Sequence, residues 1–405
     1  MQQSIRAVNS PLKAAIIIPG SKSVTIRALL MTALAKGTSH LFNLSICKET
    51  KTFLNNLREL GIAIEWNESD RTCMVTGGII SSMQNEISLD YGQSVTVLLF
   101  LIAICTLSSG TFHFHGSSQC NLRTLIQVLH SQNIKITSEQ KSSFTMINQT
   151  GLLGGEIQLK HFISALFIVA PFAKQPFTFD IKDFEGNPYA DTTLAVMAEF
   201  GVLVRRLHQG RFIVPVPQRY LARDYIIEPD LSIAAYFLAA AAVTRGEITM
   251  QAFHREFVKQ PDVKMLALFE KMGCVITEND REMTMNGSKE LQGVNIDARG
   301  YSHAFMAIAA IAPFAQTPTT ITNIRRKKYL KMMCTEFKKL QIRVESGQDW
   351  IKIFPSKPKA TLVNCHHNRY LAMAFAVIGL VTPGLVIDNV ECVDPEFFNM
   401  WEAIS

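Results

Sequence analysis

The stretch SVTIRALLMTALAKGTSHLFNL, from Ser23 to Leu44, decides the fold because its pattern recurs along the whole chain. An Ala- and Leu-rich segment is followed by Gly or Pro and a β-branched segment, which predicts a buried helix that leads into a strand. Five further copies start about 70 residues apart, and five of the six copies open on Ser, a good helix N-cap. The further copies are SVTVLLFLIAICTLSSGTFHFHG from Ser94, SALFIVAPFAKQPFTFDI from Ser164, SIAAYFLAAAAVTRGEITMQAF from Ser232, SHAFMAIAAIAPFAQTPTTITNI from Ser302 and NRYLAMAFAVIGLVTPGLVIDNV from Asn368.

Each copy is followed by a second, amphipathic helix and a further strand, so one repeat reads helix, strand, helix, strand with an additional short strand. The first helix of each repeat is apolar all round and must be buried on all sides. Three such helices inside a ring of sheets would satisfy this requirement, which predicts an α/β protein with two domains of three repeats. A single doubly wound sheet and a solenoid are the alternatives, although the GxGxxG fingerprint of dinucleotide-binding sheets is absent.

We expect one domain with the first three repeats, over residues 21–227, and a second domain with the last three repeats, over residues 228–405. The segment RYLARDYIIEPD, from Arg219 to Asp230, fits the connection between the third and fourth repeats. With 405 residues, the chain is long enough for two such cores.

Composition narrows the possible partners. The net charge of +6 comes without aromatic and basic interleaving, which favours small anionic ligands over nucleic acid. The longest apolar runs are too short to span a membrane, and Met1 to Ser10 shows no secretion signal, so we expect a cytoplasmic protein without a membrane partner. The eight cysteines form no CxxC pair and indicate reduced, mostly structural thiols.

An anion site is predicted at PGSKSVTIRALL, from Pro19 to Leu30. A Gly-Ser turn that enters a helix presents unpaired N–H groups and the positive end of the helix dipole. Lys22 adds a point charge, Ser23 a hydroxyl, and Arg27, one turn later, a fork for a carboxylate. The alternative is an exposed cap with Arg27 in a surface ion pair.

This segment resembles the PGSKS entry motif, followed by Arg-Ala-Leu, of the EPSP synthase (3-phosphoshikimate 1-carboxyvinyltransferase) family, and the six-repeat pattern extends the resemblance over essentially the whole chain. The resemblance implies the two-domain, inside-out α/β barrel-like fold of enolpyruvyl transferases. It also implies that residues 1–20 belong with residues 228–405 and that a ligand cleft lies between the two domains. It implies that Lys22 contacts phosphoenolpyruvate and takes part in catalysis, while Ser23 and Arg27 hold the shikimate carboxylate.

Further positions match the family's binding residues in part. Arg123 stands where the family has an arginine for the phosphate of phosphoenolpyruvate, and Tyr189 in GNPYADTT matches a Pro-Tyr pair beside the shikimate phosphate. Gln93 and Thr96 keep the polarity of an Asn-Ala-Gly-Thr loop, but Val95 and Leu99 replace its Gly and a later Arg. His161 stands near the Gln of a shortened Ser-Ser-Gln motif. A solvent-facing Arg123 and a buried structural Tyr189 are the alternatives.

The second half of the chain departs more from the family pattern. His303 stands at the position of the catalytic Asp, where a neutral imidazole can still act as a base. A loop with a general acid/base Glu and two cations is shortened to RRKK, from Arg325 to Lys328. The family's Asp-His-Arg appears as His367, Asn368, Arg369 and Tyr370, so Arg369 or Lys328 would replace a missing cation after a register shift. The family's late Lys falls near Asp394 and Pro395.

The resemblance implies transfer of the enolpyruvyl group from phosphoenolpyruvate to shikimate 3-phosphate in the shikimate pathway, with no cofactor, no metal and a monomeric chain. One alternative is a diverged paralogue that binds a shikimate-like carboxylate and catalyses a different reaction, such as an elimination. A second is a non-catalytic binder. UDP-N-acetylglucosamine enolpyruvyl transferases share the fold, but their Lys-Asn entry motif and their loop cysteine lack good matches at Lys22-Ser23 and Cys120.

Overall fold

The computed structural model describes residues 1–78, 86–117, 122–140, 142–159, 162–182, 184, 187–208, 210–301 and 303–405. It divides the chain into two compact units. The N-terminal unit is Pro19–Glu228, and the C-terminal unit is Met1–Ile18 together with Pro229–Ser405. Each unit has its own buried apolar core. The ligand cleft expected between two domains stays a prediction.

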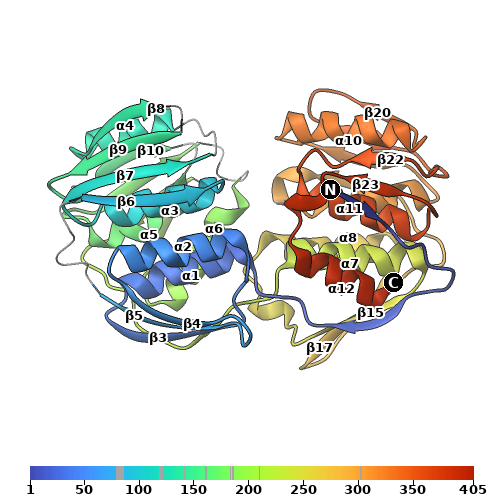
Figure 1. The fold of residues 1–405 in the computed structure, drawn as a ribbon, viewed down its shortest axis with the longest axis horizontal. Coiled ribbons are helices and arrows are strands. Elements are labelled where there is room, and N and C mark those ends of the chain that lie inside the picture. Colours follow the sequence, from blue (N-terminus) through green and yellow to red (C-terminus); the bar gives the residue numbers. More distant parts are fainter. Residues whose placement is uncertain are drawn as a thin grey trace. The chain divides into compact units, whose positions relative to one another are not determined.

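Three sheets with the same strand order build the N-terminal unit (Figure 1). They are β14(Tyr225–Ile226)-β3(Gly37–Phe42)-β5(Thr72–Gly77)-β4(Ala63–Asn67), β6(Glu86–Gly92)-β7(Gly110–Gly116)-β9(Ser143–Asn148)-β8(Lys135–Gln140) and β10(Gly155–Leu159)-β11(Phe177–Ile181)-β13(Arg211–Val214)-β12(Arg205–His208). In each sheet the first pair is parallel and the other two pairs are antiparallel. The helices are α1(Lys22–Leu34), α2(Lys48–Glu59), α3(Val95–Cys105), α4(Arg123–Ser131), α5(Ile163–Val169) and α6(Pro188–Glu199).

The C-terminal unit repeats this plan. Its sheets are β2(Lys13–Ile16)-β15(Glu247–Gln251)-β17(Glu282–Asn286)-β16(Val275–Glu278), β18(Asn295–Asp297)-β19(Thr319–Thr322)-β21(Ile351–Ile353)-β20(Val344–Ser346) and β22(Leu362–Asn364)-β23(Val386–Asp388)-β1(Gln2–Ser4). Its helices are α7(Leu231–Thr244), α8(Leu266–Lys271), α9(Phe305–Ile311), α10(Lys327–Lys339), α11(Arg369–Leu380) and α12(Pro395–Ile404). The sixth repeat ends after its second helix, and the N-terminal strand β1 completes its sheet by pairing antiparallel with β23.

The apolar helix of each repeat is buried, as predicted. Every residue of α7 except Ile233 and Val243 is buried, and α7, α9 and α11 pack against one another. Alanine is frequent in these helices because small side chains let neighbouring helix backbones approach closely. Because the described strands form separate sheets around these helices, the alternative of a single doubly wound sheet is wrong.

Two short strands explain how the chain passes between the units. The strand β2 pairs parallel with β15 of the C-terminal unit, and the chain then enters the N-terminal unit at Pro19. After the third repeat, β14 pairs parallel with β3 of the N-terminal unit, and the chain leaves that unit after Glu228. In each unit the leading strand of the first sheet therefore comes from a segment distant in sequence.

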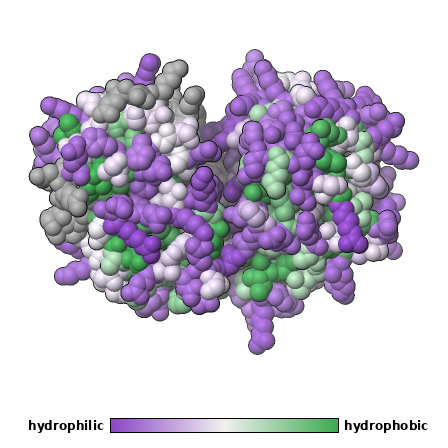
Figure 2. All heavy atoms as spheres, viewed as in Figure 1, coloured by the Kyte–Doolittle hydropathy of each residue, from purple (hydrophilic) through white to green (hydrophobic). Residues whose placement is uncertain are grey.

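Hydrophilic side chains cover most of the face drawn in Figure 2, with smaller apolar areas between them. This agrees with the apolar helices lying in the two cores. In the described part of the chain, no helix has both the length and the apolar character that crossing a membrane requires.

Candidate active site

The start of α1 provides a favourable position for an anion. Ser21 is the N-cap residue, yet its side chain accepts no hydrogen bond from a backbone N–H group of the first helical turn. Its hydroxyl lies 3.2 Å from the hydroxyl of Ser23, and the first turn contains no acidic residue. Backbone N–H groups and the positive end of the helix dipole therefore face a region that also holds two hydroxyls.

Lys22, the first residue of α1, forms an ion pair that the sequence did not reveal. Its Nζ donates to Glu49 Oε1 at 2.6 Å, with the side chains 23% and 33% exposed. Glu49 lies in the first turn of α2. An anion that reaches Lys22 must therefore compete with this carboxylate for the ammonium group.

Arg27 lies one helical turn further on and is buried, with 4% of its surface exposed. Its Nε donates to Thr193 Oγ1 at 2.8 Å, its Nη1 to the carbonyl oxygen of Ser23 at 2.7 Å and its Nη2 to Ser164 Oγ at 3.2 Å. All three acceptors are neutral, and no described carboxylate lies within ion-pair distance of this guanidinium. The alternative of Arg27 in a surface ion pair is therefore wrong.

Burial without a counter-charge changes the pKa of the Arg27 guanidinium. Removal from water lowers the pKa of Arg27 from its ordinary value of 12.5 to about 10, while the nearby Tyr189 acts in the opposite direction. Arg27 thus remains a cation at neutral pH. A guanidinium has five N–H donors, and the three hydrogen bonds leave two N–H groups without a partner among the described residues. Such a group has the charge and the donors to bind a carboxylate.

The surroundings of Arg27 come from three repeats. The guanidinium carbon lies 5.5 Å from the ring centre of Phe100 in α3 and 5.7 Å from that of Tyr189 in α6. Thr193 Oγ1 also donates to the carbonyl oxygen of Tyr189 at 2.7 Å and lies 2.8 Å from Ser164 Oγ. We call Ser23, Arg27, Ser164, Tyr189 and Thr193 the Arg27 cluster.

The sequence named Ser23, Arg27 and Tyr189 but missed Ser164 and Thr193. Two signals for them existed. Ser164 opens the third copy of the repeat, and Thr193 follows Tyr189 by four residues, which places both on one face of a helix.

The remaining predicted residues of the N-terminal unit lie at helix starts. Gln93 and Thr96 are exposed and flank Ser94, whose hydroxyl caps α3 by accepting from the Val97 N–H at 3.3 Å. Arg123 is exposed as the first residue of α4. The structure joins neither Gln93 nor Thr96 to the Arg27 cluster by a hydrogen bond between described residues.

The predicted residues of the C-terminal unit meet around two tyrosines. The His303 ring stacks on Tyr370 with 4.1 Å between ring centres and 24° between planes, and the Tyr329 ring centre lies 6.1 Å from His303. Arg369 Nη2 donates to Tyr370 Oη at 2.8 Å, and its guanidinium carbon lies 4.7 Å from the Tyr370 ring centre. We call His303, Tyr329, Arg369 and Tyr370 the His303 cluster.

Three members of the His303 cluster lie at the starts of helices. Tyr329 is in the first turn of α10, and Arg369 and Tyr370 begin α11. Asn368 is the N-cap of α11, where its Oδ1 accepts from the N–H groups of Tyr370 at 3.0 Å and Leu371 at 3.3 Å. This cap sets the first residue of α11, whereas the replacement of a missing cation by Arg369 or Lys328 stays a prediction.

Lys328 lies beside this cluster in sequence but differs in environment. It is exposed in the first turn of α10, and the adjacent Arg326 donates from Nη1 to Tyr329 Oη at 2.9 Å. Arg326 therefore contacts the cluster through Tyr329, a contact that the sequence did not indicate. Asp394 and Pro395 form the start of α12, where Asp394 Oδ1 accepts from the Glu396 N–H at 3.2 Å.

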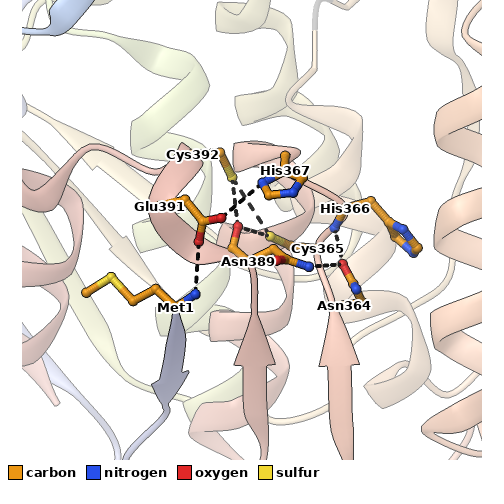
Figure 3. A network of polar contacts seen from close by, with 8 residues as sticks. All are labelled: Met1, Asn364, Cys365, His366, His367, Asn389, Glu391 and Cys392. Carbon is orange, nitrogen blue, oxygen red and sulfur yellow. Dashed lines mark hydrogen bonds and ion pairs between the residues drawn. The ribbon is translucent and has the colours of Figure 1, made fainter.

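The neighbouring histidines point away from each other (Figure 3). His366 Nε2 lies 3.1 Å from Glu336 Oε1, whereas His367 Nδ1 lies 3.2 Å from Glu391 Oε1. No three His, Cys, Asp or Glu side chains in the described ranges gather so as to hold a metal ion. His161, Cys120 and the side chain of Pro188 lie outside the described residues.

Comparison with known proteins agrees with the fold and the entry motif. The sequence profile of the family described as EPSP synthase (3-phosphoshikimate 1-carboxyvinyltransferase) matches residues 7–404. A 3-phosphoshikimate 1-carboxyvinyltransferase from Trichormus variabilis is 34% identical over 412 residues, which cover 97% of this chain and 96% of the relative. One of the same name from Shewanella oneidensis is 34% identical over 417 residues, 97% of each chain.

Solved structures confirm the predicted fold class. The EPSP synthase from Acinetobacter baumannii has a TM-score of 0.84 at 20% identity and covers 100% of this chain and 98% of its own. The enolpyruvyl transferase NikO from Streptomyces tendae has a TM-score of 0.78 at 15% identity, with 99% and 95% covered. With the full-length family match and the relatives at 34% identity, the chain belongs to the EPSP synthase (3-phosphoshikimate 1-carboxyvinyltransferase) family.

Proposed function

We propose that the protein transfers the enolpyruvyl group of phosphoenolpyruvate to a ring hydroxyl of shikimate 3-phosphate. The hydroxyl oxygen adds to C2 of phosphoenolpyruvate while C3 gains a proton, and loss of inorganic phosphate with a C3 proton restores the double bond. The observation that carries the proposal is membership of the transferase family over residues 7–404. No comparison supports a different reaction or a non-catalytic role.

The Arg27 cluster is the proposed anchor for the shikimate carboxylate. Arg27 is a buried cation without a described carboxylate partner, and two of its N–H groups remain available. A carboxylate bound there would supply the missing counter-charge and accept charge-assisted hydrogen bonds. Ser23 and Tyr189 line the same place and would contact the substrate directly.

Lys22 is the proposed catalytic cation of the N-terminal unit. Its ammonium would contact phosphoenolpyruvate and move a proton, in exchange for its ion pair with Glu49 at 2.6 Å. Arg123, Gln93 and Thr96 would bind further polar groups of the substrates from the starts of α4 and α3.

In the C-terminal unit, His303 is the proposed proton-transfer residue. An imidazole can accept a hydroxyl proton as a general base. Stacking on Tyr370 holds the ring, and Arg369 places a cation on the same tyrosine. Lys328, exposed at the start of α10, would add a second cation for the phosphate of phosphoenolpyruvate. Action as a monomer in the cytoplasm, without a cofactor, stays a prediction.

Release of inorganic phosphate from the purified protein tests the proposal. Phosphate that appears only when shikimate 3-phosphate and phosphoenolpyruvate are both present is the expected result. Phosphate from shikimate 3-phosphate alone would indicate an elimination, and release in neither case would contradict both reactions. Lys22→Ala should slow the release at least about 10²-fold. Lys48→Ala is the matched control, because Lys48 is likewise the first residue of its helix and is exposed.

A further inference from the structure

A pair of thiols lies apart from both proposed clusters, at the end of the sheet that β1 completes. Cys365 follows β22, and Cys392 ends the short 3-10 helix Val390–Cys392 that follows β23. Their Sγ atoms are 3.8 Å apart, and Cys365 Sγ lies 3.0 Å and Cys392 Sγ 3.5 Å from the carbonyl oxygen of Asn389.

The backbone around these thiols holds them in position (Figure 3). Asn364 Oδ1 accepts from the N–H of His366 at 2.6 Å and from Asn389 Nδ2 at 3.0 Å, so one side chain joins the two turns. His366, His367 and Asn389 all have left-handed backbone conformations, with φ of 54°, 53° and 64°. Non-glycine residues adopt this region at an energetic cost, so the sharp turns are imposed by the surrounding structure.

Only a small movement separates these thiols from a covalent bond. A disulfide has a sulfur–sulfur length of about 2.05 Å, so each sulfur would move by roughly 0.9 Å, a distance that side-chain rotation can supply. Cys392 is partly exposed, whereas Cys365 is buried, so an oxidant from solvent meets Cys392 first. The remaining described cysteines are buried.

The polar surroundings favour a thiolate within this pair. The hydrogen bond from Cys392 lowers the pKa of the Cys365 thiol, burial opposes this effect, and the backbone N–H groups of His367 and Asn368 support it. The proton remains on Cys392, since the hydrogen bond with Cys365 raises the pKa of the Cys392 thiol. Cys365 therefore holds the thiolate of the pair, which can take a proton from Cys392 and can attack Cys392 once that sulfur is oxidised.

We propose that Cys365 and Cys392 form a reversible disulfide when the protein meets a peroxide. The Cys365 thiolate takes the proton of Cys392 as the Cys392 sulfur attacks one peroxide oxygen, the O–O bond breaks, and the leaving hydroxide accepts that proton, which gives a Cys392 sulfenic acid and one water. The Cys365 sulfur then attacks the sulfenic sulfur, the S–O bond breaks, and the second water leaves. In total, two thiols and one hydrogen peroxide give one disulfide and two waters. The cross-link restrains the segment 365–368, which leads directly into Arg369.

The sequence allows a direct covalent test in the full-length protein. Trypsin cleaves after Lys359, Arg369 and no later residue, so Cys365 and Cys392 fall on separate peptides, Ala360–Arg369 and Tyr370–Ser405. The native protein is treated with hydrogen peroxide, its free thiols are alkylated, and the digest is analysed by mass spectrometry without reduction. We expect the two peptides joined, two hydrogens lighter than their sum, and separated again by dithiothreitol.

Variants and alternative products make the test decisive. Cys392→Ser should remove the joined species, whereas Cys334→Ser, a buried cysteine in the same unit, should leave it unchanged. Both peptides recovered separately and alkylated after peroxide treatment would overturn the proposal. Cys392 found as a sulfinic acid, or joined to other cysteines as often as to Cys365, would also overturn it. The readout is covalent, so it does not depend on the proposed transferase activity.

Discussion

Replacement of Arg27 by methionine should separate stability from activity. Methionine is apolar and similar in length, so it fills the space beside Phe100 and Tyr189 while it removes the charge. The pKa of about 10 lies about 2.5 below the ordinary value of 12.5. At about 1.4 kcal/mol for each tenfold change in the protonation equilibrium, burial of the cation costs between about 3 and 4 kcal/mol.

The pH dependence of this cost follows from the lowered pKa of Arg27. The folded state disfavours the protonated guanidinium, so the cost is fully present below pH 10 and declines as the pH rises from about 10 towards 12.5. At neutral pH, Arg27→Met removes the cost but also three hydrogen bonds, to Ser23, Ser164 and Thr193, each worth about 1 kcal/mol net. The two effects nearly cancel, so the free energy of unfolding should change by less than about 2 kcal/mol.

The effect on activity should be much larger. Two charge-assisted hydrogen bonds to a carboxylate are worth about 3 to 6 kcal/mol together, which corresponds to a loss of about 10² to 10⁴ in kcat/KM for shikimate 3-phosphate. Urea denaturation measures the stability, and steady-state phosphate release measures kcat/KM. Arg205→Met, at an exposed position in β12, is the control that should change neither.

Two results would refute this reasoning. Unchanged kcat/KM in Arg27→Met would show that the buried cation does not bind substrate. A loss of more than about 4 kcal/mol in unfolding free energy would show that Arg27 serves mainly to hold the N-terminal unit together.

Three further outcomes follow from the described contacts. Lys22→Ala should lower kcat at least about 10²-fold with stability within about 0.5 kcal/mol, as thermal unfolding and phosphate release can measure, while Lys48→Ala retains activity. Tyr370→Phe keeps the ring but removes the hydrogen bond to Arg369, so KM for phosphoenolpyruvate should rise about 10-fold; an unchanged KM would contradict the proposed role of the His303 cluster. Arg299 lowers the pKa of Asp297 from 3.8 to about 2 by hydrogen bonding, so stability from this carboxylate is present above pH 3.8 and lost towards pH 2. Asp297→Asn should therefore flatten acid unfolding in that range, and a curve identical to that of the parent protein would contradict this.

The fold could be predicted from the sequence because every repeat contains a helix that is apolar on all sides and must be buried. A helix such as Leu231–Thr244, with apolar residues on every side, has to be enclosed by other elements, and six such helices at regular spacing imply two enclosed groups. The strand β1 could not be predicted as the completion of the last sheet. Its residues Gln2–Ser4 are polar, and their pairing with Val386–Asp388 is a contact between the two ends of the chain.

The candidate site was predictable where the residues are close in sequence. The motif from Ser21 to Arg27 comprises the N-cap and the first two turns of α1, so spacing alone placed its charges together. The partners of Arg27 were not predictable, because Thr193 and Ser164 are separated from it by 166 and 137 residues. The burial of Arg27 was likewise hidden, since a sequence does not show which face of a helix meets a neighbouring repeat.

The contacts within the His303 cluster could not be predicted from the sequence either. The stacking of His303 on Tyr370 joins the starts of two helices from different repeats, and the register of α11 depends on the cap formed by Asn368. The sequence placed Arg369 and Lys328 as equal candidates for a missing cation. The structure brings Arg369 onto Tyr370 and leaves Lys328 exposed on α10.

The most direct test of the proposed transferase activity is identification of both products in one reaction. The purified protein is incubated with shikimate 3-phosphate and phosphoenolpyruvate, and phosphate and the organic product are quantified together by mass spectrometry and a phosphate assay. We predict equal amounts of phosphate and of shikimate 3-phosphate that carries an enolpyruvyl group. Phosphate without that adduct, or no turnover by a protein that is folded and binds both substrates, would contradict the proposed function.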